Sequence, residues 1–154
     1  MGEHANAGTG IDVAPVWARF NESLIQLVDY VPDDKINWSP KPELWNFRGI
    51  LLHIAGAREG WLLHGVKLDE QPIDPYRTVR TKDEIKDAYA RSWQWVERFI
   101  SDPAKLDAMY DDEDGPVSGH WIAFHLLEHD IHHRADIFHY LALLGIETPD
   151  VGTP

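Results

Sequence analysis

The sequence predicts an all-α fold, a bundle of four helices, from three observations. Apolar residues recur at three- and four-residue spacings in several long segments, which is typical of amphipathic helices. No segment shows the strand-like alternation of apolar and polar residues, and the sequence contains no repeat. The chain has 154 residues, 44% of them hydrophobic, enough for one domain with its own core. We therefore expect a single domain over residues 11–154, preceded by a disordered tail over residues 1–10.

The first predicted helix spans residues 11–31, where the apolar residues follow helical spacing and Pro32 ends the segment. The connection over residues 32–43 carries three prolines, so we expect it to be irregular, with Trp38 packed against the bundle.

The second predicted helix begins at about residue 44 or 46 and ends at residue 66. It contains His53 and His64, which point the same way but lie roughly 16 Å apart along the axis, too far to share an ion. Small residues lie on the same side as His53, namely Gly49, Gly56, Ala57 and Gly60. They favour the close approach of another helix or of a ligand, and helix packing is the simpler explanation.

A linker over residues 67–80 precedes Thr81 and Glu84, which form the T-x-x-E pattern of a capping box. The third predicted helix starts there and continues to about Ser101, before Pro103. Residues 102–116 include the acidic run DDEDGP. An EF-hand calcium loop aligned on Gly115 would place aromatic residues at its first and last ligand positions, so we expect a solvated acidic loop.

The fourth predicted helix, Val117 to Leu144, contains no proline and is followed by Gly145, a residue favoured just after a helix. It holds six of the nine histidines. His125, His129 and His133 step by four residues, so each side chain is rotated by only about 40° from the last and the three form one stripe. An i, i+4 pair of histidines on a helix can bring two imidazole nitrogens to one metal ion.

Other polar and aromatic residues have simpler explanations. Glu128 and Asp130 point about 100° away from His129, so we expect ordinary charges on the helix surface. His132 is expected to be a hydrogen-bonded structural residue, and three more histidines are expected to be incidental: His64, His120 and His139. Four tryptophans are expected to belong to the core: Trp38, Trp45, Trp61 and Trp121.

Composition restricts the classes of partner and site. The formal net charge of −12 disfavours nucleic acid and anionic membranes as partners, because both need clustered Lys and Arg. Cysteine is absent, so a metal site must use histidine and carboxylate ligands. There is no apolar run of membrane-spanning length and no signal-peptide pattern, which makes the cytoplasm the expected location.

The chain resembles the DinB/YfiT-like superfamily of four-helix proteins in three places. The first is VPDDKINWSPKPELWNF followed by LLHIAGAREGWL. The second is HLLEHDIHHRADIFHYLALLG, which is similar to the family's H-x-x-x-H followed by H-H-R-G-Q. The third is the tail GIETPDV, so that the resemblance covers most of residues 12–151.

The resemblance implies a divalent metal held by one histidine of the second helix and two positions four apart on the fourth. In this sequence these are His53, His129 and His133. Three ligands and a water would leave an open coordination position, as in catalytic sites. Zinc or nickel is the expected ion, and iron, manganese or copper are alternatives. The family's Arg-Gly-Gln is replaced here by Arg134-Ala135-Asp136, and Asp136 could orient an imidazole as a hydrogen-bond acceptor. His125 is expected beside the ligands or in a pocket.

Two functions from different classes follow. In the first, the protein is a metal-dependent enzyme acting on a small molecule, either a hydrolase or an S-transferase that uses a low-molecular-weight thiol, as the resemblance implies. The carboxylates of such a thiol would need cationic partners, for which Arg48, Arg58 and Arg134 are the candidates. In the second, the bundle binds metal without turnover; a site closed by four protein ligands would favour this role. Haem is a weaker alternative because there is no C-x-x-C-H. The resemblance also implies a homodimer.

Overall fold

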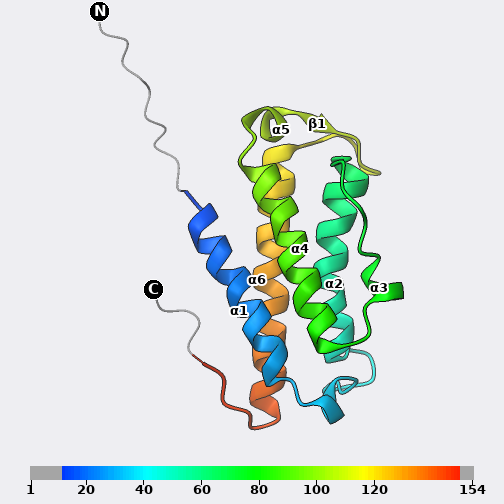
Figure 1. Cartoon of the computed structure of the whole chain (residues 1–154), viewed down its shortest axis with the longest axis vertical. Coiled ribbons are helices and arrows are strands. Elements are labelled where there is room, and N and C mark those ends of the chain that lie inside the picture. Colours follow the sequence, from blue (N-terminus) through cyan, green and yellow to red (C-terminus); the bar gives the residue numbers. More distant parts are fainter. Residues whose placement is uncertain (1–11, 150–154) are drawn as a thin grey trace, which may run out of the picture.

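Four long helices pack side by side in the computed structural model, which describes residues 12–149 (Figure 1). They are α1 (Ala14–Tyr30), α2 (Phe47–Glu59), α4 (Lys82–Ile100) and α6 (Gly119–Leu143). Helix α1 packs chiefly against α4, and α2 packs chiefly against α6. The all-α four-helix bundle is thereby confirmed. The expected disordered tail, residues 1–10, lies outside the described residues.

The ends of the long helices follow the local signals in the sequence. The Asn46 side chain accepts a hydrogen bond from the Gly49 amide and starts α2. Thr81 and Glu84 form both hydrogen bonds of the expected capping box at the start of α4. Gly145 follows α6 with φ of 72°, a left-handed conformation that costs glycine little. The helix predicted to end at residue 66 does continue that far, but its last turn, η2 (Gly60–Gly65), is a π-helix.

Short elements occupy the connections between the long helices. They are η1 (Asp33–Lys35), α3 (Pro75–Thr78), α5 (Pro103–Asp107), β1 (Met109–Tyr110) and β2 (Val117–Ser118). The acidic run at residues 111–116 is a largely exposed loop between β1 and β2, as expected, but the elements that flank it, α5 and the β1–β2 pair, were not predicted from the sequence. The Asp102 side chain accepts from the amides of Ala104 and Lys105 and starts α5, and β1 pairs with β2 in an antiparallel ladder. Strands of two residues are too short to show an alternating pattern in the sequence.

The apolar core forms two clusters along the bundle. One contains Leu24, Phe47, Leu51 and Leu141. The other contains Trp17 of α1 together with residues of α4 and α6. Trp38 packs against the core as expected, with its ring tilted against Phe47 and edge-on to Tyr140. In contrast, the assignment of two other tryptophans to the core is wrong: Trp45 is 51% exposed and Trp121 is 42% exposed.

A buried ion pair joins the helices at the centre of the bundle. The Arg58 guanidinium of α2 and the Asp130 carboxylate of α6 lie 2.7 Å apart, and both side chains are fully buried. Asp130 also accepts from Trp17 of α1 at 2.9 Å, while Arg58 donates to Asn21 of α1 at 2.8 Å and to Ser92 of α4 at 3.2 Å. The expectation that Asp130 is a surface charge is wrong, because α6 is covered by neighbours on more than one side. Arg58 is likewise not available to a ligand.

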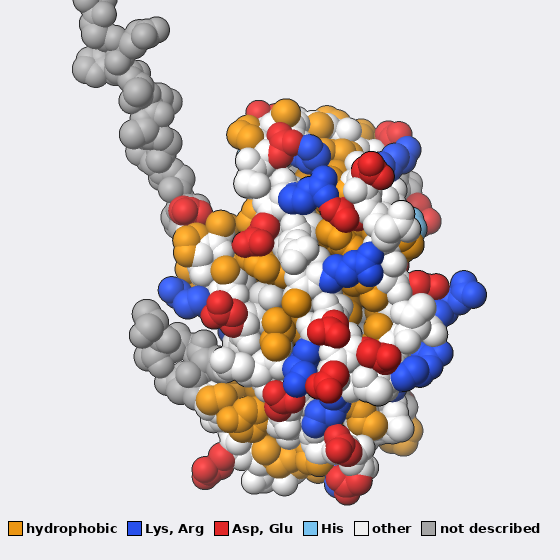
Figure 2. Space-filling view, viewed as in Figure 1, with side chains coloured by type: hydrophobic (Ala, Val, Ile, Leu, Met, Phe, Trp, Pro, Cys, Tyr) orange, Lys and Arg blue, Asp and Glu red, His pale blue; other side chains and the backbone are white. Residues whose placement is uncertain are grey.

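The surface of the bundle carries charges of both signs. On the face shown in Figure 2, Lys and Arg side chains are interspersed with Asp and Glu rather than gathered in one patch. Of the helices within residues 12–149, none combines the length and the apolar character required to cross a membrane.

Candidate metal centre

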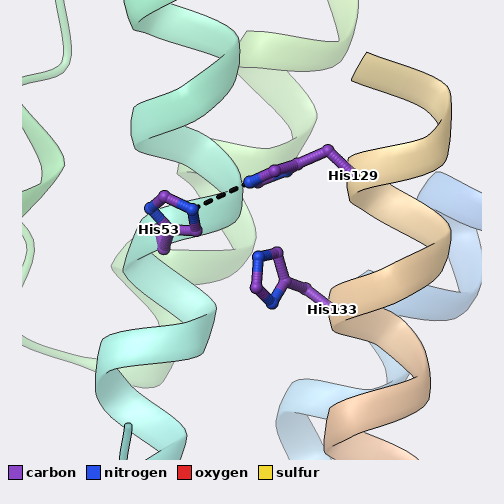
Figure 3. A group of neighbouring side chains, drawn as sticks. All are labelled: His53, His129 and His133. Carbon is purple, nitrogen blue, oxygen red and sulfur yellow. Dashed lines mark hydrogen bonds between the residues drawn. The ribbon is translucent and has the colours of Figure 1, made fainter. Parts of the chain in front are cut away.

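Three histidines from two helices converge at the interface between α2 and α6 (Figure 3). His53 lies in the middle of α2, and His129 and His133 lie on successive turns of α6. The Nε2 atoms of His53 and His129 are 2.8 Å apart. One ring nitrogen from each of the three residues lies within 4.8 Å of the others. The two helices thus present three imidazole nitrogens to one small volume.

The second ring nitrogen of two of these histidines is held by a neighbour. His53 Nδ1 lies 3.0 Å from the Tyr76 hydroxyl, and His133 Nδ1 lies 3.1 Å from the Asp136 carboxylate. A proton held on Nδ1 by such a partner leaves the lone pair of Nε2 free for a metal ion. His129 differs, because its Nδ1 is buried and has no hydrogen-bond partner among residues 12–149.

The surroundings keep all three imidazoles neutral. Burial, followed by the neighbouring imidazoles of His133 and His53, lowers the pKa of His129 to about 3. Burial and the proximity of His133 lower the pKa of His53. Burial also lowers the pKa of His133, although Asp136 opposes the shift. Neutral imidazole is the form that binds metal ions, so these histidines need not lose a proton near pH 7.

Aromatic rings surround the three histidines. The Trp45 ring lies edge-on to His53 with centroids 4.4 Å apart, and it stacks parallel to His133 at 6.0 Å. One turn earlier on α6, His125 stacks on Trp121 at 4.8 Å and meets the edge of Trp61 at 5.3 Å. The i, i+4 spacing of Trp121 and His125 was a signal in the sequence for this contact. Nothing in the sequence pattern indicated the position of Trp45.

A cavity of about 450 Å³ adjoins the histidines. Its walls come from α2, from η2, from the loop between β1 and β2, and from α6. They are formed by His53, Ala57, Gly60, Trp61, Gly65, Asp111, Asp112, His125 and His129. His125 therefore lies in the cavity wall, with its ring 6.3 Å from that of His129, and it is not among the three converging ligands.

The other candidates lie away from this cavity. His132 is exposed and lies 3.6 Å from Asp136; with His133 these residues form a second, more open group that shares one member, His133, with the first. Arg48 donates to the carbonyls of Val79 and Arg80, and Arg134 donates to Ser23 and lies over Phe20. The remaining histidines, His64, His120 and His139, are exposed.

Two glycines of the α2 segment make room next to the histidines. A Cβ atom at Gly56 would lie 2.8 Å from the ring of Tyr76, so the glycine lets Tyr76 approach His53. At Gly60 a Cβ atom would meet nothing within 4 Å, and this residue faces the cavity. The expectation that these glycines serve helix packing is therefore wrong at Gly60, whereas Gly56 allows the close approach of Tyr76 from the short helix α3.

The donor set fits a divalent transition-metal ion. Three neutral imidazoles suit zinc, nickel, copper or iron, and two of the rings already have the outer hydrogen bonds that orient metal ligands. No fourth histidine or carboxylate belongs to the converging group among residues 12–149, so the protein supplies three ligands beside a cavity. This is the arrangement of sites with an open coordination position.

Comparison with known families identifies the chain. The DinB superfamily profile matches residues 17–137. The protein belongs to the DinB superfamily. No significant match was found among curated proteins.

Solved structures of other DinB-like proteins share the fold. A DinB-like protein from Bacillus cereus has a TM-score of 0.72 and 22% identity, with 88% of this chain and 92% of the other covered. YjoA, a DinB-like protein from Bacillus subtilis, has a TM-score of 0.72 and 18% identity, with 90% and 96% covered. At these identities the similarity of this DinB superfamily member to both proteins concerns the fold.

Proposed function

We propose that this protein is a divalent-metal-dependent enzyme that acts on a small molecule, with hydrolysis as its reaction type. The ion would be held by His53, His129 and His133. The observation that carries the proposal is the convergence of three neutral imidazoles at the wall of a cavity of about 450 Å³. Cavities of this size are common for small-molecule substrates.

The chemistry would be divided between the ion and the chain. A divalent ion held by His53, His129 and His133 would supply Lewis-acid chemistry, by lowering the pKa of water and polarising a substrate oxygen. The chain orients the ligands through Tyr76 and Asp136. Trp45 covers His53 and His133 on one side and limits access of water there. The cavity beside His129 then provides the approach for a substrate.

Hydrolysis is favoured over S-transfer by the charges around the cavity. The carboxylates of a small thiol cofactor would require cationic partners, but Arg48, Arg58 and Arg134 all have other partners and none lines the cavity. The cavity wall instead contains two carboxylates, Asp111 and Asp112. A metal-binding bundle without turnover is disfavoured because a closed structural site would use four protein ligands.

Metal content is the direct test of this proposal. The untagged native chain should bind about one equivalent of zinc or nickel, as a three-histidine site predicts, and His129→Ala/His133→Ala should bind none. A matched control is His120→Ala/His139→Ala, which removes two exposed histidines of the same helix and should keep the metal. The metal-loaded protein is then assayed with ester, amide and thiol-transfer substrates. A native chain that takes up no metal, or a double variant that still binds it, overturns the proposal.

A further inference from the structure

The cavity beside the histidines is also lined by two carboxylates and a tryptophan: Asp111, Asp112 and Trp61. We propose that it selects an organic cation, a small molecule with an ammonium group on an apolar or aromatic body. The carboxylates and the tryptophan of the cavity wall would bind the ammonium group. The hydrolysable oxygen of the substrate would face His53 and His129. This inference rests on the proposed function and names its substrate class.

The charges on the cavity wall are all of one sign. Asp111 and Asp112, in the loop that joins β1 to β2, are the charged residues among those that line it, and no Lys or Arg does so. Neither carboxylate forms an ion pair or accepts a side-chain hydrogen bond within residues 12–149. Acids elsewhere on the bundle form ion pairs, for example Glu70 with Arg98 and Asp29 with Lys86. The cavity therefore presents unpaired negative charge, which attracts a cation and repels an anion.

An aromatic ring in the same cavity wall suits an organic cation better than a hydrated metal ion. Trp61 lines the cavity, and Trp121 holds the adjacent His125 in a parallel stack. The face of a tryptophan attracts ammonium groups, most strongly where water is excluded. The lining surface is also predominantly apolar, which favours a ligand with an apolar body.

The backbone leaves room for such a ligand. Gly60 and Gly65 lie in the π-helical turn, which borders the cavity together with His53 and Ala57 of α2. A Cβ atom at Gly60 would meet nothing within 4 Å. π-Helical turns within helices occur frequently at functional sites, because the wider turn changes the direction of the side chains that follow. In this protein, Trp61 of the π-helical turn contacts the ring of His125, and both residues line the cavity.

The test compares three probes that share a phenyl ring and bind metals weakly: benzyltrimethylammonium, benzyl alcohol and benzenesulfonate. Binding is measured by calorimetry at low salt, on the metal-free and zinc-loaded native chain. We expect the cation to bind about tenfold more tightly than the alcohol, as one cation–aromatic contact with two nearby carboxylates implies, and the anion to bind most weakly. Added salt should reduce the preference.

Variants assign the preference to this cavity. Asp111→Asn/Asp112→Asn should lose about tenfold in affinity for the cation, and Trp61→Leu should lose a similar factor. Glu113→Gln/Asp114→Asn is the matched control: it removes two charges from the same loop at positions that do not line the cavity. It should retain the native affinity. Gly60→Leu should fill the cavity and weaken binding of all three probes.

The outcomes separate this inference from the proposed function. Equal affinity for the cation and the alcohol, or equal losses in the loop variant and its control, overturns the cation site even if one equivalent of zinc is bound. A cation preference that depends on Asp111 and Asp112 supports the site even if the histidines bind no metal. Far-ultraviolet circular dichroism of each variant confirms that losses do not come from unfolding.

Discussion

The histidine cluster and the Arg58–Asp130 network are neighbours on the same two helices, yet they are built in opposite ways. Asp130 directly follows His129 on α6, and Arg58 follows His53 by little more than one turn on α2. The network is charged, fully buried and bonded to residues of all four helices. The cluster is neutral, only partly buried and open to a cavity. In the network, the charges of Arg58 and Asp130 neutralise each other and tie the four helices together. In the cluster, imidazole nitrogens keep lone pairs that an ion could use.

The largest expected effect comes from breaking the network. Asp130→Ala leaves the Arg58 guanidinium buried without its counter-ion, which should lower the free energy of unfolding by about 3–5 kcal/mol. Urea denaturation measures the change. Glu128→Ala, an exposed acid two residues earlier, is the control and should remain within about 0.5 kcal/mol of the native chain. Equal losses in the two variants would show that the buried pair has no special structural role.

The second prediction concerns the carboxylate that orients the cluster. Asp136→Asn keeps the shape of the side chain but removes the charge next to His133 Nδ1. Metal affinity, measured by competition with a chelator, should fall about 10- to 100-fold. Asp107→Asn, at an exposed carboxylate that pairs with His120, provides the control and should leave the affinity unchanged. If Asp136→Asn also binds metal with native affinity, the assignment of Asp136 as an orienting residue is wrong.

The third prediction follows from the lowered pKa values. Because the pKa of His129 is about 3 in the folded chain, the unfolded chain, with ordinary histidine pKa values near 6.5, binds more protons between these values. The free energy of unfolding of the metal-free protein should therefore decrease as the pH falls below about 6.5. His129→Leu should show a shallower decrease. Urea denaturation at a series of pH values tests this, and parallel curves for the two proteins would contradict it.

The smallest effect is expected at the other orienting contact. Tyr76→Phe removes the hydroxyl next to His53 Nδ1, but Tyr76 is 54% exposed and water can replace the lost group. Metal affinity should fall only about threefold, corresponding to a weak hydrogen bond. The same chelator competition measures it. A loss as large as that of Asp136→Asn would mean that Tyr76 does more than orient His53.

The helices and the histidine stripe could be predicted because both depend on local periodicity. His129 and His133 are one turn apart on any helix, whatever surrounds it. The burial of Asp130 could not be predicted in this way. Its partners, Trp17 and Arg58, come from two other helices. A polar residue about 100° from the histidine stripe is equally compatible with solvent and with a second interface. The positions of Trp45 and Tyr76 depend on connections between helices, whose paths are not periodic.

The three converging histidines come from chain segments separated by 76 residues, His53 on one side and His129 on the other. An ion bound to all of them would act as a removable cross-link that exists only in the folded chain. Each tenfold excess of free metal over its dissociation constant would then add about 1.4 kcal/mol to the free energy of unfolding. The melting temperature would consequently rank the candidate metals by affinity, with no substrate required.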